Sequence, residues 1–147
     1  MKTELESPIV LLGSRLLSPY IMLFGFYVIF HGHYSPGGGF QGGTLLAASF
    51  ILMRLSAGRV LSNLQLKVFM TTPLAAAGVL IYFLTGIVSV LYGGYFLDYG
   101  ALPFPGGLDP DQLRYYGILV IEVGIGIAVM AVLVMIYDHL IEGEDYD

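Results

Sequence analysis

The sequence predicts an all-α integral membrane protein with four transmembrane helices and both termini in the cytoplasm. Of its 147 residues, 56% are hydrophobic and only 12% are charged, whereas soluble domains carry about 25% charged residues. Its mean hydropathy is +0.80. Four apolar windows reach the roughly 20 residues that a helix needs to cross a bilayer. No internal repeat or linker separates them, so we expect residues 1–147 to form a single membrane domain.

The first predicted span covers residues about 9–30 and contains Arg15 and Pro19. The residues before it, MKTELESP, lack the basic stretch and the small-residue cleavage site of a signal peptide. We therefore expect this first span to be retained.

The second predicted span has the weakest signal. Its plainly apolar run, residues 44–53, is too short to cross a bilayer, so a crossing has to include residues about 38–57. This choice places Gly42 and Gly43 inside the membrane and Arg54 near one end of the span. The long side chain of Arg54 is expected to extend to the interface there.

The third predicted span, residues about 71–92, contains no charge, and Thr71 and Thr72 before Pro73 suit a helix start. The fourth covers residues about 116–137. Residues 97–114 between them are rich in proline and glycine, so we expect an ordered connection without helix.

Lysine and arginine residues in the short flanks predict the orientation. The side of the membrane with both termini holds five of them, namely Lys2, Arg15, Arg54, Arg59 and Lys67, and the other side holds only Arg114. The positive-inside rule therefore places both termini and the 54–67 loop in the cytoplasm. The loops near residues 33 and 109 are expected to lie outside.

The composition excludes several classes of function. A net charge of −5 with only 6 basic residues argues against nucleic acid as a partner. The absence of cysteine excludes a thiolate nucleophile, an iron-sulfur cluster and a cysteine-ligated zinc site, and the histidines form a thin set of metal ligands. We therefore expect no metal, no cofactor and no enzymatic activity of the chain by itself.

Residues 31–43, HGHYSPGGGFQGG, form the most informative segment. Gly37, Gly39 and Gly42 spell G-x-G-x-x-G, but the strand before it and the acidic residue after it that a dinucleotide site requires are missing. We expect instead a tight outer hairpin. In it, Pro36 stops the first helix, and Gly37, Gly38 and Gly39 supply backbone angles that other residues resist.

After this turn, Gly42 and Gly43 allow another helix to approach closely, Phe40 is expected to fill an adjoining groove, and Gln41 offers a hydrogen-bonding group. Two interpretations of the segment stay open. It is either a turn that serves packing alone or part of a route for ions.

Glu122 lies about six residues inside the fourth span. An acidic side chain at the centre of a span costs about 2.5 to 3.5 kcal/mol, and less toward the ends, so it has to face protein or water. Helical spacing puts it on one face with Gly126, whereas the small residues Gly117, Gly124, Ala128 and Ala131 gather on another. The small-residue face suits close helix packing.

His31 and His33 lie at the outer end of the first span, about level with Glu122. We expect His31 and Glu122 to be close enough to form a protonatable pair in an ion or proton pathway. The alternatives are that the histidines are hydrated interfacial side chains and that Glu122 meets a cation of another subunit and only holds a complex together.

Arg15 and Asp138 occupy similar depths near the cytoplasmic side of the first and fourth spans. They form a candidate ion pair. The alternative is that each side chain extends separately to the interface.

The segment HGHYSPGGGFQGG, followed by an apolar helix and much later by EVGIGIAVMAVLV, resembles the small B-type subunit of the Mrp-type multisubunit cation/proton antiporters. The likeness spans nearly the whole chain, including the four-span layout. It implies a multi-pass subunit of a prokaryotic plasma membrane that works in a hetero-oligomer with larger antiporter-like subunits. The matching positions are Pro36, Gly37, Gly38, Gly39, Phe40, Gly42 and Gly43.

Two functions follow from this resemblance and stay open. The chain is either an accessory antiporter subunit that contributes to Na⁺/H⁺ translocation and complex assembly, or a purely structural subunit in the ion-translocating module of a respiratory complex. Similar subunits occur in archaeal membrane-bound hydrogenases and sulfur-reducing complexes, so the second function would make the chain a component of a translocating oxidoreductase.

Overall fold

A computed structural model describes residues 7–32, 34, 37–107 and 109–144 of the chain. In order, its helices are α1 (Pro8–Phe30), α2 (Gly39–Ser62), α3 (Val68–Leu91) and α4 (Pro110–Glu144), with a short 3-10 helix η1 (Tyr99–Ala101) between α3 and α4. The described residues contain no strand. The prediction of an all-α fold is confirmed.

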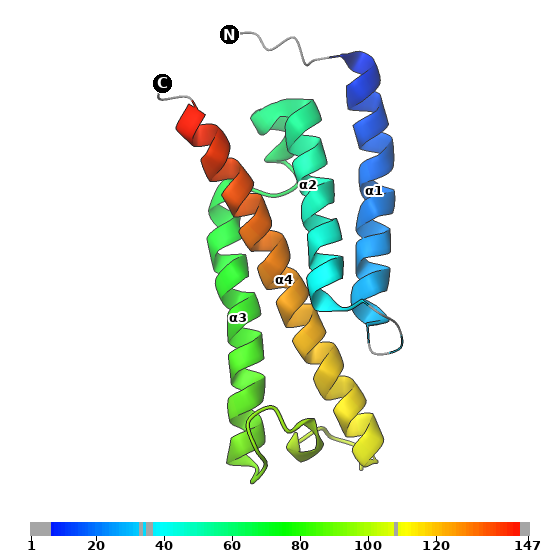
Figure 1. Ribbon diagram of the computed structural model, residues 1–147, viewed down its shortest axis with the longest axis vertical. Coiled ribbons are helices and arrows are strands. Elements are labelled where there is room, and N and C mark those ends of the chain that lie inside the picture. Colours follow the sequence, from blue (N-terminus) through cyan, green and yellow to red (C-terminus); the bar gives the residue numbers. More distant parts are fainter. Residues whose placement is uncertain (1–6, 33, 35–36, 108, 145–147) are drawn as a thin grey trace.

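The helices do not pack in chain order. The hairpin of α1 and α2 joins the hairpin of α3 and α4 through a contact between α2 and α4, while the described residues of α2 and α3 do not pack together. Figure 1 shows the resulting sequence α3, α4, α2, α1 across the molecule. The contact between α2 and α4 is therefore the main connection between the two halves of the described chain, and a smaller contact between α1 and α4 adds to it.

Within the described residues, three helices are long and apolar enough to cross a membrane: α1, α3 and α4 as far as Ile141. The second helix is not among them, because it begins with the polar, glycine-rich sequence GFQGGT and carries Arg54. It is also interrupted at Gly58, whose φ is 70°. The predicted second crossing therefore stays a prediction.

The connection between the third and fourth helices differs from the prediction that residues 97–114 contain no helix. Residues 99–101 form η1, and α4 begins at Pro110, whose fixed φ suits the first turn of a helix. Tyr99 packs against Gly117, where an added Cβ would lie 2.6 Å from the Tyr99 Cβ. Burial raises the pKa of the Tyr99 phenol, and Tyr82 raises it further, so this side chain serves packing in its neutral form.

Small residues bring α1 and α2 together. The Ser49 hydroxyl donates to the Ser18 carbonyl at 2.9 Å and lies 2.7 Å from the Ser18 hydroxyl. Nearer the turn, a Cβ on Gly42 would lie 2.7 Å from the Gly25 carbonyl oxygen. The two backbones therefore touch, as the predicted close approach at Gly42 requires.

Close contacts at small residues also pack α4 against its two neighbours, α2 and α3. A Cβ on Gly43 of α2 would lie 2.6 Å from the Gly126 carbonyl oxygen, and a Cβ on Gly78 of α3 would lie 2.6 Å from the Ala128 nitrogen. Gly124 also lies against Gly78. Gly124 and Ala128 of the predicted small-residue face thus pack against α3.

We expect Gly43→Ala to destabilise the chain by about 1 to 3 kcal/mol, because the new methyl group meets backbone that cannot turn aside. The matched control is Gly13→Ala, since nothing lies within 4 Å of a Cβ at Gly13. That change should be neutral or stabilising by up to about 1 kcal/mol, the difference in helix propensity. Thermal unfolding of the chain in its purified complex measures both, and equal effects would show that the close approach is unimportant.

Candidate functional site

Glu122 of α4 lies against the ends of α1 and α2. A Cβ on Gly32 would lie 2.6 Å from the Glu122 Oε2, and a Cβ on Gly38 would lie 2.9 Å from the Oε1. The carboxylate therefore occupies space that any other residue at these two positions would fill. Gly38 is also constrained by its backbone, whose φ of 117° favours glycine.

The Glu122 side chain is partly exposed, while its Oε2 atom is buried. At the start of α2, Gly39 packs directly against the Glu122 backbone carbonyl. Glu122 thus makes two kinds of contact. Its backbone packs against Gly39 at the start of α2, and its carboxylate lies beside Gly32 and Gly38, which flank the link between α1 and α2.

His31 follows the last turn of α1 and is exposed. Its ring stacks on Tyr27 with 4.2 Å between ring centroids, and its Nδ1 lies 3.0 Å from the Tyr27 carbonyl oxygen. Within the part of the chain that the structure describes, these contacts direct the ring onto its own helix. The expected contact with Glu122 stays a prediction, and His33 lies outside the described residues.

The glycine segment divides into buried and exposed positions. Gly38, Gly39, Gly42 and Gly43 are buried or packed against backbone, whereas Gly37, Phe40 and Gln41 lie at the surface. Pro36 lies outside the described residues. The Phe40 side chain is 66% exposed in this chain, so its expected place in an adjoining groove stays a prediction.

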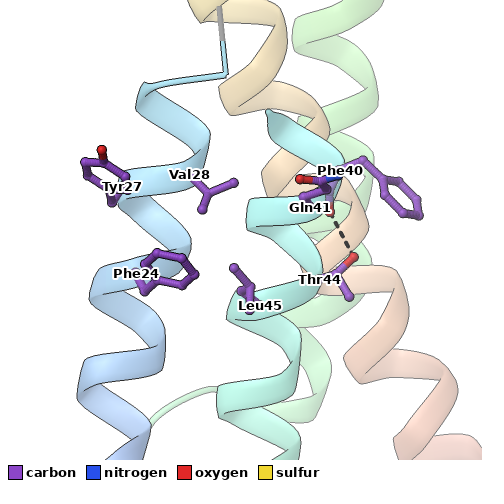
Figure 2. A pocket seen from close by; sticks show the side chains of 7 residues that line it. All are labelled: Phe24, Tyr27, Val28, Phe40, Gln41, Thr44 and Leu45. Atoms are coloured by element: carbon purple, nitrogen blue, oxygen red, sulfur yellow. Dashed lines mark hydrogen bonds between the residues drawn. The ribbon is translucent and has the colours of Figure 1, made fainter. Parts of the chain in front are cut away.

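Phe40 lies at the edge of a groove of about 480 Å³ between α1 and α2. Figure 2 shows the groove and its mostly apolar lining, which consists of Phe24, Tyr27, Val28, Phe40, Gln41, Thr44 and Leu45. The Thr44 hydroxyl donates to the Phe40 carbonyl at 2.8 Å, so its polar group is satisfied within the helix.

A buried ion pair lies at the other end of the contact between α2 and α4. Arg54 Nη1 is 3.2 Å from Asp138 Oδ1, and the two side chains are 4% and 3% exposed. Arg54 Nη2 donates to the Leu66 carbonyl at 3.1 Å. One guanidinium therefore joins α2, α4 and the segment that leads to α3.

This pair corrects two predictions. Asp138 faces Arg54 and not Arg15, which is exposed on α1, because α2 packs between α1 and the Asp138 end of α4. Arg54 is also buried and does not extend to the interface as predicted. Both charges stand at the cytoplasmic ends of their predicted spans, but the sequence does not reveal which helices are neighbours.

The two acidic residues of α4 discussed above, Glu122 and Asp138, are far apart. Glu122 and Asp138 are 16 residues apart, which corresponds to about 24 Å along a helix. No cluster of three His, Cys, Asp or Glu side chains that could hold a metal ion occurs among the described residues. The site thus offers a single carboxylate near the turn and a neutralised ion pair at the opposite end.

Residues 9–135 match the model of a family described as a domain related to the MnhB subunit of Na⁺/H⁺ antiporter. The chain belongs to this family. The match includes the glycine segment, Arg54 and Glu122, so the resemblance to the B-type subunit of Mrp-type antiporters is confirmed over most of the chain.

Two relatives carry the name "Putative antiporter subunit mnhB2". The protein from Staphylococcus haemolyticus is 36% identical over 137 residues, covering 87% of this chain and 95% of the relative. The protein from Staphylococcus aureus strain Newman is 35% identical over 134 residues, covering 85% and 93%. With its three apolar helices, the MnhB-type chain is a multi-pass protein of the plasma membrane.

We expect Arg54→Gln to destabilise the chain by about 3 to 5 kcal/mol, because it leaves the Asp138 carboxylate in a buried site without its cation. The double variant Arg54→Gln with Asp138→Asn should recover much of this loss, since both charges are then removed. Thermal unfolding in the complex measures the effect.

The control is Arg15→Gln, which removes the same charge from an exposed position and should change stability by no more than about 0.5 kcal/mol. A loss as large as that of Arg54→Gln would contradict the assignment of Arg54 as the cation that faces Asp138.

Proposed function

We propose that this chain is an accessory membrane subunit of a multisubunit cation/proton antiporter. In this role it contributes Glu122 to Na⁺/H⁺ translocation and its helix surfaces to complex assembly. The family assignment supports the antiporter role. The observation that carries the proposal is the Glu122 carboxylate held against Gly32 and Gly38, within the segment that gives the chain its likeness to the Mrp-type antiporters.

The proposed topology has four crossings in one domain, residues 1–147, with both termini in the cytoplasm. Its support is the alternating direction of the four helices, since α1 begins and α4 ends at the same end of the molecule in Figure 1. The second helix, which is the least apolar, packs against α1 on one side and α4 on another. Gly39, Gly42, Gly43 and Arg54 are buried within the protein.

The depth of Glu122 supports a location inside the membrane. Thr72 donates to the Met135 sulfur at 3.6 Å, which fixes the level of the start of α3 on α4. Leu91 lies 19 residues further along α3, or about 28 Å, so the end of α3 is level with α4 near residue 116. Glu122 is then about 9 Å inside that level.

A carboxylate at this depth has a substantial desolvation cost unless protein groups, water or a cation accompany it. Figure 1 shows that α3 and α4 extend beyond the end of α1 and the start of α2. The end of α1 and the start of α2, where Glu122 packs, therefore lie nearer the middle of the molecule than the neighbouring ends of α3 and α4.

The alternative function is a purely structural subunit in the ion-translocating module of a respiratory complex. The contact of Glu122 with the glycine backbone favours this structural function. If the carboxylate serves only to stabilise the segment between α1 and α2, no transport role is needed to explain it. The two functions predict different consequences for the same substitution.

For the translocation role, Glu122→Gln should leave the amount of assembled complex unchanged. It should reduce Na⁺/H⁺ antiport in membrane vesicles by at least about tenfold, because the amide cannot exchange a proton and a positioned acid or base typically contributes about 100-fold or more. The amide has the shape of the carboxylate, so the fit against Gly32 and Gly38 is kept. Complex yield and antiport are measured on the same membranes.

Asp111→Asn is the control, because Asp111 is an exposed acidic residue on the same helix. It should change neither assembly nor antiport. Loss of assembly in Glu122→Gln would support the structural role, and normal assembly with normal antiport would overturn the proposed role of Glu122.

A further inference from the structure

Gln41 of α2 has an exposed side chain, and its position along the molecule follows from the contact of α2 with α4. Gly39 packs against the Glu122 carbonyl, and Gly43 packs against the Gly126 carbonyl. Both helices thus advance by four residues between these contacts, so they run in the same direction. Gln41 lies midway between the two glycines and is therefore level with residue 124 of α4.

This level lies well inside the proposed membrane-spanning region. The end of α3 is level with residue 116, which precedes residue 124 by eight residues of α4, or about 12 Å. In the other direction, Arg54 follows Gln41 by 13 residues of α2, or about 20 Å. A glutamine side chain is shorter than the lysine and arginine side chains that extend to a membrane interface, so the amide stays at this depth.

The Gln41 amide makes no hydrogen bond to any residue that the structure describes. Thr44, one turn further along α2, is also exposed, but its hydroxyl donates to the Phe40 carbonyl at 2.8 Å. Acyl chains neither donate nor accept hydrogen bonds, and burying an amide among them without a partner is strongly unfavourable. Gln41 therefore requires a hydrogen-bonding group that the described residues of this chain do not supply.

The surroundings of Gln41 are apolar. It lines the groove of about 480 Å³ between α1 and α2. Figure 2 shows Phe24 and Val28 of α1 pointing toward α2, where Leu45 lines the opposite wall. Ordered water needs several polar partners, and a mostly apolar groove of this kind does not provide them. The features of the groove favour protein as its cover.

The exposed face of α2 continues from Gln41 with small residues. Thr44 and Ala48 follow it at helical spacing, and both are exposed. Small residues let the backbone of a second membrane helix approach closely. This helix is also the one long helix of the described chain that does not meet the length and apolarity expected of a membrane span, so further protein on its exposed face is expected.

We propose that a membrane-spanning helix of a neighbouring subunit lies in this groove and offers a hydrogen-bonding group to Gln41. Its apolar side chains pack against Phe24, Val28 and Leu45. Lipid could fill the groove but could not satisfy the amide. The inference rests on the proposed place of the chain in a multisubunit complex and on its proposed topology, but not on transport through Glu122.

Photocrosslinking in the assembled complex identifies what covers the groove. Phe24 and Phe40 line it from α1 and α2, and each is replaced in turn by p-benzoylphenylalanine, an aromatic residue of related shape. The control is the same replacement at Phe69, which is 72% exposed at the start of α3, at the other end and the other edge of the molecule in Figure 1. The adducts are mapped by mass spectrometry after illumination in native membranes.

We expect the Phe24 and Phe40 variants to form adducts with one membrane helix of a different subunit, at positions within about two turns of each other. The Phe69 variant should not form adducts with those positions. Adducts with lipid alone, with a second copy of this chain, or with the same positions from all three sites would overturn the proposal.

The hydrogen bond is tested by Gln41→Leu, which keeps the size of the side chain and removes the amide. The ratio of bound to free neighbouring subunit, measured in detergent through an affinity tag on this chain, should fall by about threefold, the typical effect of one hydrogen bond between membrane helices. Thr44→Val is the matched control, because the Thr44 hydroxyl is already satisfied within α2. It should leave the ratio unchanged. An unchanged or higher ratio in Gln41→Leu would show that lipid covers the amide.

The two proposals fail in different ways. If the chain purifies from native membranes without any other subunit, its proposed role in a multisubunit antiporter is wrong. If it purifies with other subunits while the Phe24 and Phe40 variants form adducts with lipid alone, the antiporter role stands and the helix in the groove is wrong.

Discussion

The close contact between α2 and α4 is the constraint on which the rest of the structure depends. These two helices are not consecutive, yet their contact is the main connection between the two helical hairpins. Their approach requires that Gly39 and Gly43 carry no side chain, because their backbones already touch α4. In a bilayer, where apolar side chains gain little from leaving lipid for protein, such packing is a main source of helix association.

Ionisable groups stand at both ends of this contact, and their surroundings differ. Asp138 is buried beside a cation that also satisfies a backbone carbonyl, so the desolvation of both charges is offset by direct interactions. Glu122 lies against glycines and keeps partial exposure. A neutralised, enclosed pair is suited to holding helices in register, whereas a partly exposed carboxylate is suited to exchange with its surroundings.

The sequence predicts the helices well and their neighbours poorly. Apolar length locates α1 and α2 within one or two residues at their starts, because both are bounded by proline or glycine. It places the start of α4 near residue 116 instead of Pro110, since the polar first turns of that helix project beyond the apolar window. Hydropathy measures transfer into lipid and does not detect a helix that continues outside it.

The sequence also does not predict the partner of Asp138, because it does not show which helices are neighbours. Arg15 and Arg54 are both cationic, and both lie near the same end of the predicted spans. Only the order of helices across the molecule decides between them. By contrast, the polarity of Glu122 marks it as a residue that needs polar neighbours, and the glycines of residues 37–43 mark a close approach. The structure brings these two signals together at one place.

The order of the helices also accounts for the composition of α2. This helix carries the polar residues Ser49 and Arg54 as well as several glycines, and it packs against two helices. The outer helices α1 and α3 each have one major neighbour, and their exposed faces are large and apolar, as at Leu23 and Phe83. Placing the least apolar helix inside the row buries Ser49 and Arg54 within the protein. It also puts the glycine segment beside Glu122, so the packing that covers these polar groups of α2 is the same packing that forms the candidate site.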